Sequence, residues 1–149
     1  MITTEEVKAL REATGLSIMQ CRKALEDAGG DKDKAIILLK EKGAEIATKK
    51  SDRALGAGIV TSYIHTGETV GVMLELLCET DFVAKSPEFK SVARDIAMHI
   101  VAMSPSDTTE LLAQPFIKNP EQKISDLINN TVQKFGERTE VGHFVRFSI

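Results

Sequence analysis

The sequence lacks the short motifs by which many phosphate-binding and metal-dependent enzymes are recognised. It contains no GxxxxGKS/T phosphate loop, no GxGxxG, no CxxC pair and no HExxH. Its histidines, His65, His99 and His143, fall on separate predicted elements, and their spacing does not indicate a metal site. We therefore expect no catalytic residue, no metal ion and no cofactor.

Long apolar runs and an excess of basic charge are also absent. The runs AIILL and VGVMLELLC are far shorter than a membrane-spanning helix. The acidic, polar start MITTEEVKAL is unlike a secretory signal peptide. The net charge of −3 leaves no basic field for general nucleic-acid binding. We expect a cytoplasmic protein that binds neither membrane nor nucleic acid directly.

Cysteine is scarce, and both cysteines lie within hydrophobic patterns. Cys21 and Cys78 are therefore predicted as buried free thiols rather than a disulfide, because a free cysteine behaves as a small hydrophobic residue. A nucleophilic role for Cys78 would need a nearby base or a lowered thiol pKa, and no neighbour in the sequence supplies either.

Residues 1–43 predict a helical module of three short helices. Apolar residues recur at helical spacing in each of them, and the bundle resembles the ubiquitin-associated type. The three helices are predicted to begin at Thr3, paired with Glu6, at Ser17, paired with Gln20, and at Asp31. The third is predicted to end at Gly43. Residues 44–56 show no clean apolar stripe and are predicted to be a linker, in part helical.

Met19 does not fit the apolar stripe of its helix. At 100° per residue it points away from Cys21, Leu25 and Ala28. An exposed methionine is either an isolated apolar surface residue or an adaptable contact for a partner. The periodicity alone leaves both interpretations open.

Residues 57–149 predict an α+β core domain with a mainly antiparallel sheet packed against helices. Two β-rich segments, 57–65 and 68–78, are joined by a hairpin signal. A helix follows Ser86 and Pro87, a second is predicted from Asn119 to a stop at Gly136, and alternation predicts a closing strand. Apolar residues occur on both faces of the second strand, and Met98 and Val101 lie off the stripe of their helix. Both features indicate a further contact surface.

The segment LLCETDFVAKSPEF places a phenylalanine in a strand-to-helix connection, where small polar residues are usual. Phe82 either anchors the connection beneath the sheet edge, which is the commoner arrangement, or is exposed as an interface residue. The residues themselves do not decide between these two interpretations.

Three stretches together resemble the bacterial elongation factor Ts family, the nucleotide exchange factors of elongation factor Tu. They are LREATGLSIMQCRKALEDAGGDKDKAIILLKEKG, the stretch from AGIVTSYIH to TDFVAKSPEF, and QPFIKNPEQKISDLI with the closing strand. The resemblance covers nearly the whole chain. It implies a translation factor without an active site of its own.

The resemblance also implies which residues contact the partner. In the family, the aromatic residue of TDFVA inserts between helices of the Tu GTPase domain and disturbs the magnesium and phosphate site. On this chain Phe82 would be that wedge, with Thr80, Asp81 and Val83 beside it. Family contacts from the N-terminal module match the positions of Arg11, Ile18 and Met19.

Longer family members carry a second core subdomain and a coiled-coil protrusion. Here the chain passes directly from VAMSPSDTTELLA to QPF, which leaves room for one core unit. Short members of the family form homodimers, so the resemblance implies a symmetric dimer. Two other hypotheses are a ubiquitin-associated-type adaptor that binds helices or nascent chains, and a thiol-dependent enzyme centred on Cys78.

Overall fold

Capping boxes begin the first two helices, as the sequence predicts. In the computed structural model, which describes residues 1–149, α1 spans Thr4–Thr14 and α2 spans Ile18–Asp27. Each begins with a hydroxyl that accepts a hydrogen bond from the backbone three residues later. Gly15, at a φ of 69°, provides the left-handed turn that ends α1.

The third helix is longer than predicted, and Gly43 does not end it. Helix α3 spans Lys32–Lys49 and begins at Asp31, as expected. Gly43 lies buried in its interior, where a Cβ atom would approach within 3.2 Å of the backbone oxygen of Asn129. The glycine therefore permits a close contact with helix α7, and residues 44–49 of the predicted linker are helical.

The three helices of the module enclose a small hydrophobic core. Its buried side chains come from α1, α2, α3 and the first turn between helices, and they include one of the two thiols. They are Val7, Leu10, Leu16, Cys21, Ala24, Leu25, Ala35 and Leu39. A core of this size is marginal by itself, so the module gains from resting on the rest of the chain.

An antiparallel three-stranded sheet forms the second part of the molecule. Strands β1 (Ala57–Ile64), β2 (Val70–Cys78) and β5 (Glu140–Ser148) lie in the order β1-β2-β5. Both neighbouring pairs are antiparallel. The predicted α+β class is therefore confirmed, and so is the closing strand.

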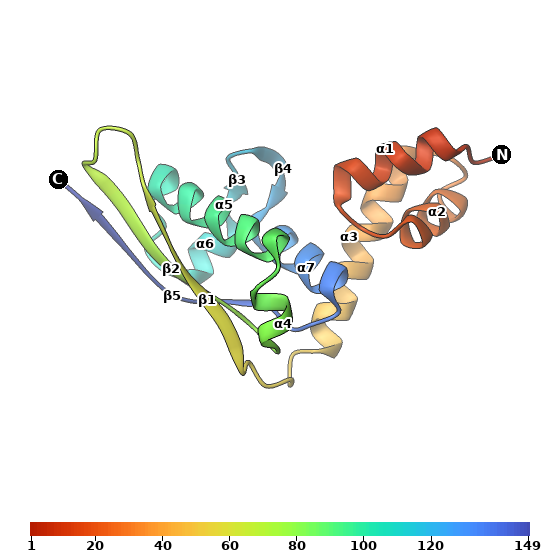
Figure 1. Cartoon of the computed structure of the whole chain (residues 1–149). Helices are drawn as coiled ribbons and strands as arrows, with labels where there is room; N and C mark the ends of the chain where they lie inside the picture. Colours follow the sequence, from red (N-terminus) through yellow and green to blue (C-terminus); the bar gives the residue numbers. More distant parts are fainter.

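Helices cover one face of this sheet (Figure 1). The remaining elements are α4 (Asp81–Ala84), α5 (Pro87–Met103), α6 (Thr108–Ala113), α7 (Ile124–Phe135) and the two-stranded pair β3 (Pro115–Phe116) and β4 (Asn119–Lys123). Helix α5 lies on the sheet, and α7 lies between α5 and α3. The predicted start of α7 at Asn119 was wrong, because residues 119–123 form β4. No helix is both long and apolar enough to cross a membrane.

The inner face of the sheet carries the main hydrophobic core. The alternating side chains of β2 point inward and are almost fully buried, as predicted; they are Val72, Leu74, Leu76 and Cys78. They pack on apolar residues of α5 such as Phe89 and Ile96. Val101 is only 7% exposed and belongs to this core, so its predicted role in a contact surface was wrong.

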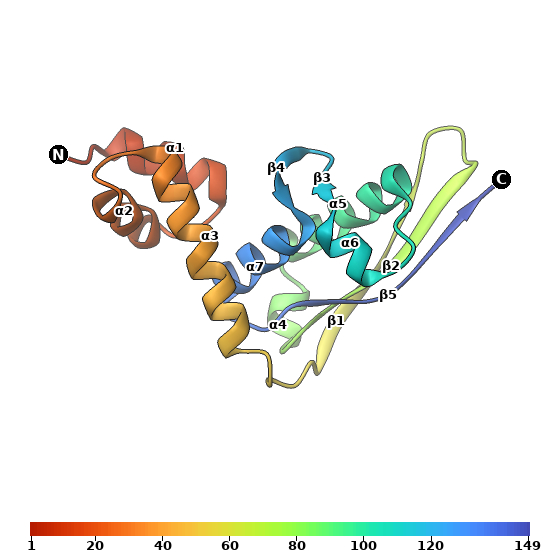
Figure 2. The ribbon, with the colours of Figure 1, turned by 180° about the vertical axis from the view of Figure 1, so that it is seen from behind.

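No helix covers the outer face of the sheet in either ribbon view (Figures 1 and 2). The sheet and the helical module lie at opposite ends of the molecule, and so do the two chain termini. The order across the molecule is therefore open sheet face, sheet, α5, α7, α3 and module.

The contact at Gly43 predicts a stability difference between neighbouring positions of α3. Gly43→Val should destabilise the protein by about 1–3 kcal/mol, because added side-chain atoms would press on the α7 backbone. The control Ala44→Val changes an exposed position of the same helix and should cost at most about 0.7 kcal/mol. Denaturant unfolding measures both, and equal losses would contradict the close contact.

Candidate protein-interaction site

The TDFVA segment forms a very short helix that is capped at its start. Thr80 is extended, and its hydroxyl oxygen accepts a hydrogen bond of 3.4 Å from the backbone N–H of Val83. Directly after α4, the hydroxyl of Ser86 accepts from the N–H of Phe89 and begins α5. Two successive caps thus define the turn between β2 and α5.

Phe82 projects from this turn into solvent. Its side chain is 88% exposed, whereas the next two residues, Val83 and Ala84, are each 4% exposed and pack in the main core. Because burial of these two fixes the inward side of α4, Asp81 and Phe82 are left on the outward side. The interpretation of Phe82 as an anchor beneath the sheet edge was therefore wrong.

The helical module also exposes large apolar side chains. Ile18 and Met19 begin α2 and are 56% and 83% exposed, while neighbouring Leu16 is buried at 1%. Arg11 lies exposed in the last turn of α1. Met19 thus lies outside the module core, as its position off the apolar stripe predicts.

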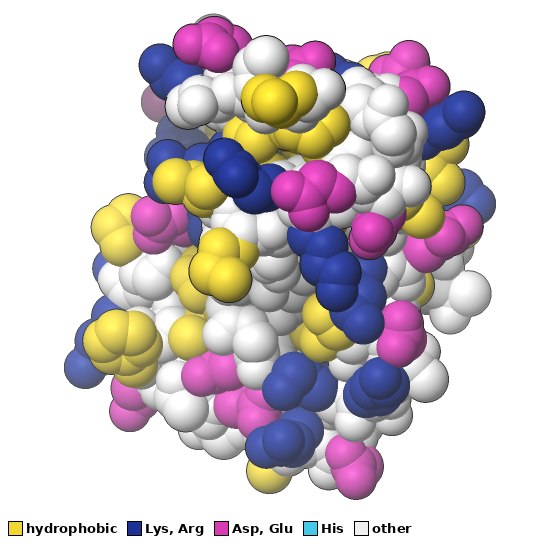
Figure 3. All heavy atoms as spheres, turned by 90° about the vertical axis from the view of Figure 1, so that its right-hand side faces the viewer, with side chains coloured by type: hydrophobic (Ala, Val, Ile, Leu, Met, Phe, Trp, Pro, Cys, Tyr) yellow, Lys and Arg dark blue, Asp and Glu magenta, His cyan; other side chains and the backbone are white.

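The helices that carry these two exposed sets lie on one side of the molecule. Helices α1, α2 and α4 lie nearer the viewer in Figure 1 and are fainter in Figure 2, where α3 lies in front. The same side forms the left-hand side of Figure 3, where hydrophobic side chains occur at several heights among charged ones.

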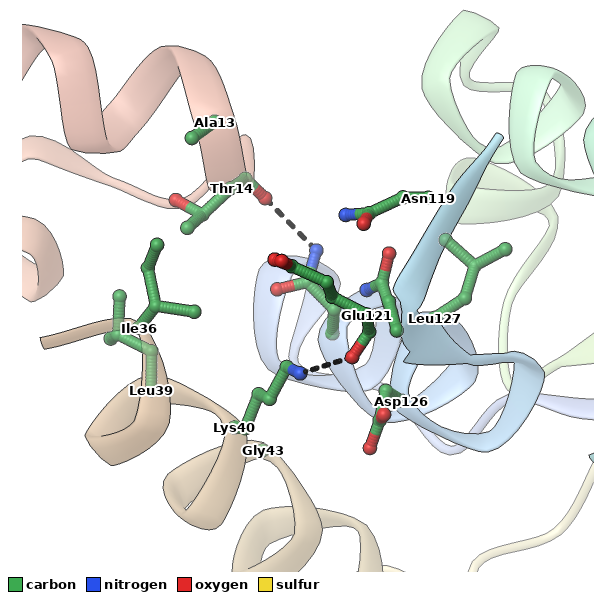
Figure 4. Close-up of a pocket in the computed structure, with 12 residues that line it drawn as sticks. Ala13, Thr14, Ile36, Leu39, Lys40, Gly43, Asn119, Glu121, Asp126 and Leu127 are labelled. Atoms are coloured by element: carbon green, nitrogen blue, oxygen red, sulfur yellow. Dashed lines mark hydrogen bonds between the residues drawn. The ribbon is translucent and has the colours of Figure 1, made fainter. Parts of the chain in front are cut away.

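Polar contacts join the module to the core beside a cleft of about 290 Å³ (Figure 4). The amide nitrogen Nδ2 of Asn130 donates to the carbonyl oxygen of Thr14 at 2.9 Å. Lys40 Nζ donates to the carbonyl oxygen of Glu121, also at 2.9 Å. Together with the packing at Gly43, these bonds hold the module in one orientation on α7.

The uncovered face of the sheet is largely apolar. All three strands, together with Ile149 directly after β5, contribute exposed side chains: Val60, Ile64, Met73, Val145, Phe147 and Ile149. Met73 lies opposite Ser62 on one side and Val145 on the other, so these residues share the face. A monomer seldom leaves such a continuous apolar surface in water.

The two cysteines are buried and unpaired, as predicted. Burial raises the pKa of the Cys78 thiol, and the nearby carboxylate of Glu137 raises it further. The thiol therefore stays protonated near neutral pH, whereas a thiol-dependent enzyme needs the thiolate.

His99 is a buried histidine, and both of its ring nitrogens have a hydrogen-bond partner. Its Nδ1 accepts a 3.3 Å hydrogen bond from the N–H of Ile117, so Nε2 carries the proton and donates to Gln114 Oε1 at 2.9 Å. Burial lowers its pKa, and the hydrogen bond to Gln114 opposes this in part. The neutral ring therefore links α5 to the segment that precedes β4.

The contact of Glu137 with the exposed turn was not predicted from the sequence. Glu137 follows the end of α7, far from Thr80 along the chain, yet its carboxylate accepts hydrogen bonds from Thr80. The only local signal is its place directly after Gly136, the helix stop, and that signal says nothing about its partner.

These features define a two-part α+β protein in which an exposed phenylalanine and an exposed module surface lie on parts joined by direct hydrogen bonds. The family model for elongation factor TS matches residues 8–109 and 79–149. The elongation factor Ts of Thermodesulfovibrio yellowstonii is 43% identical, with 99% of this chain and 96% of the relative covered. That of Carboxydothermus hydrogenoformans is 40% identical, with 100% and 89% covered. The chain belongs to the elongation factor Ts family and thus to the machinery of translation elongation.

The alignments with these relatives contain positions that have no counterpart in this chain. The alignment with the Thermodesulfovibrio protein extends over 192 residues, whereas the chain has 149 residues, so at least 43 positions have no counterpart here. The chain is thus shorter than its alignment with this relative, and the single core unit stays a prediction.

The geometry of the turn predicts that Phe82 contributes nothing to folding. Phe82→Ala should change the free energy of unfolding by less than about 0.5 kcal/mol, because the side chain is already in water. The control Phe89→Ala removes a fully buried ring and should cost about 3–5 kcal/mol. Thermal or denaturant unfolding measures both, and a large loss for Phe82→Ala would place that ring in the core.

Proposed function

We propose that the protein promotes the exchange of GDP for GTP on elongation factor Tu. Phe82 enters the Tu GTPase domain, with Asp81 as its polar neighbour and Thr80 and Val83 shaping the turn. The wedge disturbs the groups that hold the magnesium ion and the nucleotide phosphates. The single observation that carries the proposal is the 88% exposure of Phe82 on a turn that lies between the N-caps of α4 and α5.

Exchange by this route needs no covalent step on the factor. A factor that binds nucleotide-free Tu more tightly than nucleotide-bound Tu must weaken nucleotide binding by the same ratio. The difference arises if the bound form has no room for the Phe82 ring. GTP displaces the factor by the same reciprocity.

Phenylalanine suits this role because it adds binding energy without a charge that must be desolvated. Burial of its exposed ring in a partner is worth about 1.5–3 kcal/mol. Since about 1.4 kcal/mol corresponds to a factor of ten, the ring alone can shift nucleotide affinity by roughly 10- to 100-fold. Its exposure before binding means that no folding contact is lost when it is inserted.

Arg11, Ile18 and Met19 form the second proposed contact with Tu. Two apolar side chains already in water can be buried on the partner, and Met19 can adapt its shape to the surface it meets. The bonded junction between module and core keeps this contact at a constant position relative to Phe82. Little orientational freedom is then lost on binding.

We also propose that two copies pair through the uncovered sheet face. A symmetric dimer places the same apolar residues on both sides, and Met73 and Phe147 would lie within it. The Glu75–His143 pair, whose atoms Oε1 and Nδ1 are 2.8 Å apart, lies on the same face and supplies polar contacts. The second copy would cover the surface that the short chain leaves open.

The adaptor hypothesis has the module as its only support. Deletion of residues 1–50 would not test it cleanly, because the second half of α3 packs on α7 and its loss would expose that helix. The surface variant Met19→Lys leaves this packing intact. An adaptor would lose its binding through this change, whereas an exchange factor keeps the Phe82 contact.

The exchange proposal predicts a large effect of one exposed ring. Phe82→Ala should reduce the acceleration of GDP release from Tu by about 10- to 100-fold, in line with the burial energy of the ring. Release of a fluorescent GDP analogue from purified Tu measures it. The control Ile37→Ala removes another exposed apolar side chain, 55% exposed on α3, and should leave the rate unchanged. Acceleration that survives Phe82→Ala would assign exchange to the other contacts.

The pairing proposal predicts a change of mass on adding charge to the sheet face. Wild-type protein should sediment as a dimer, whereas Met73→Glu with Phe147→Glu should sediment as a monomer, because four carboxylates would meet in the interface. Ile37→Glu should remain dimeric. A monomeric wild type at micromolar concentration would exclude the pairing.

A further inference from the structure

Glu137 lies where three segments of the chain meet. It follows Gly136, whose φ of 70° ends α7, and it precedes β5. Its half-buried carboxylate faces the end of β2 and the start of α4 rather than any lysine or arginine. The partners of this carboxylate are thus the groups that lead into the Phe82 turn.

The carboxylate accepts three hydrogen bonds. Oε1 accepts from the backbone N–H of Glu79 at 3.1 Å and from the N–H of Thr80 at 2.9 Å. Oε2 accepts from the hydroxyl of Thr80 at 2.7 Å. Hydrogen bonds to an ionised acceptor are stronger than neutral ones, so Glu137 holds both the backbone and the side chain of Thr80.

The Thr80 hydroxyl connects Glu137 to the helix that carries Phe82. Because it donates its proton to Glu137, its lone pairs are free to accept from the N–H of Val83, at 3.4 Å. Helix α4 has four residues, too few to form by itself. It depends on this cap and on the burial of Val83 and Ala84.

A reciprocal set of bonds holds Glu137 in place. The Glu79 carboxylate accepts from the N–H of Arg138 at 2.6 Å, while the Glu137 carboxylate accepts from the N–H of Glu79. The guanidinium of Arg138 donates to the carbonyl oxygen of Arg53, in the segment after α3, at 2.6 Å. The segment after α7 is thereby bound both to the end of β2 and to the connection from the module.

We infer that Glu137 is a positioning residue for nucleotide exchange: its three hydrogen bonds hold Thr80 and, through it, the turn that presents Phe82 to the GTPase. The inference rests on the proposed exchange function and on the proposed insertion of Phe82. Glu137 itself touches no reacting group. It sets the position and the rigidity of the turn from which the Phe82 side chain enters the GTPase.

The first test separates the rate of exchange from binding. Glu137→Ala should lower the maximal rate of GDP release at saturating factor by about tenfold, within the range set by loss of the ring's contact. The concentration for half-maximal effect should change little, because the module contacts remain. Glu137→Gln keeps an oxygen for the two backbone donors and should retain most of the rate. Equal rates for wild type and Glu137→Ala would overturn the inference.

A double-mutant cycle tests whether Glu137 acts through Phe82. If it does, Glu137→Ala should have no further effect in a protein that already carries Phe82→Ala. Losses that multiply would show an independent role and overturn the inference. Thr80→Val, which removes only the connecting hydroxyl, should reproduce part of the Glu137→Ala loss. Unfolding curves identify any variant that has lost its fold. If Glu137→Ala is unfolded, the exchange rates of Thr80→Val and Glu137→Gln test the inference in its place.

A readout without Tu separates failure of this inference from failure of the proposed function. The chain contains no tryptophan, so Phe82→Trp introduces a single reporter at the turn. Its fluorescence anisotropy should fall when Glu137→Ala is added and remain high with Glu137→Gln. Unchanged anisotropy with Glu137→Ala would overturn the positioning role. A wild-type chain that fails to accelerate GDP release would overturn the exchange proposal, and with it the functional meaning of Glu137.

Discussion

The close packing of α3 on α7 at Gly43 is the constraint on which the arrangement of the molecule depends. Each of the two parts has its own hydrophobic core, and that of the module contains only eight buried side chains. Because α3 contributes to the module core at its start and packs on α7 at its end, the two parts are joined through one continuous helix. A continuous helix and its packing on α7, rather than an irregular linker, therefore set how the exposed surfaces of the two parts lie relative to each other.

Local signals in the sequence predicted much of the fold. Capping residues such as Thr3, Ser17 and Asp31 act within a single turn, so their partners are near in the chain and the helix starts were correct. Alternation along β2 likewise predicted its buried face. The exposure of Met19 followed from its place on the helix. These are all properties that depend on neighbours a few residues away.

The errors concern contacts between distant segments. Gly43 has the residue type of a helix stop, and only its contact with α7 makes it an interior residue. Val101 lies off the stripe of its own helix but is buried by other elements. Phe82 could be placed outside only once Val83 and Ala84 were seen in the core. Glu137 escaped notice because its partners, Glu79 and Thr80, lie more than fifty residues earlier.

The burial of both native thiols has a practical consequence for experiments. Cys21 and Cys78 are each 0% exposed, so maleimide dyes will not reach them while the protein is folded. A single cysteine introduced on the surface becomes the only reactive position, without removal of the native pair. Donor and acceptor dyes can then be attached to the factor and its partner, and the docking of each surface followed in real time.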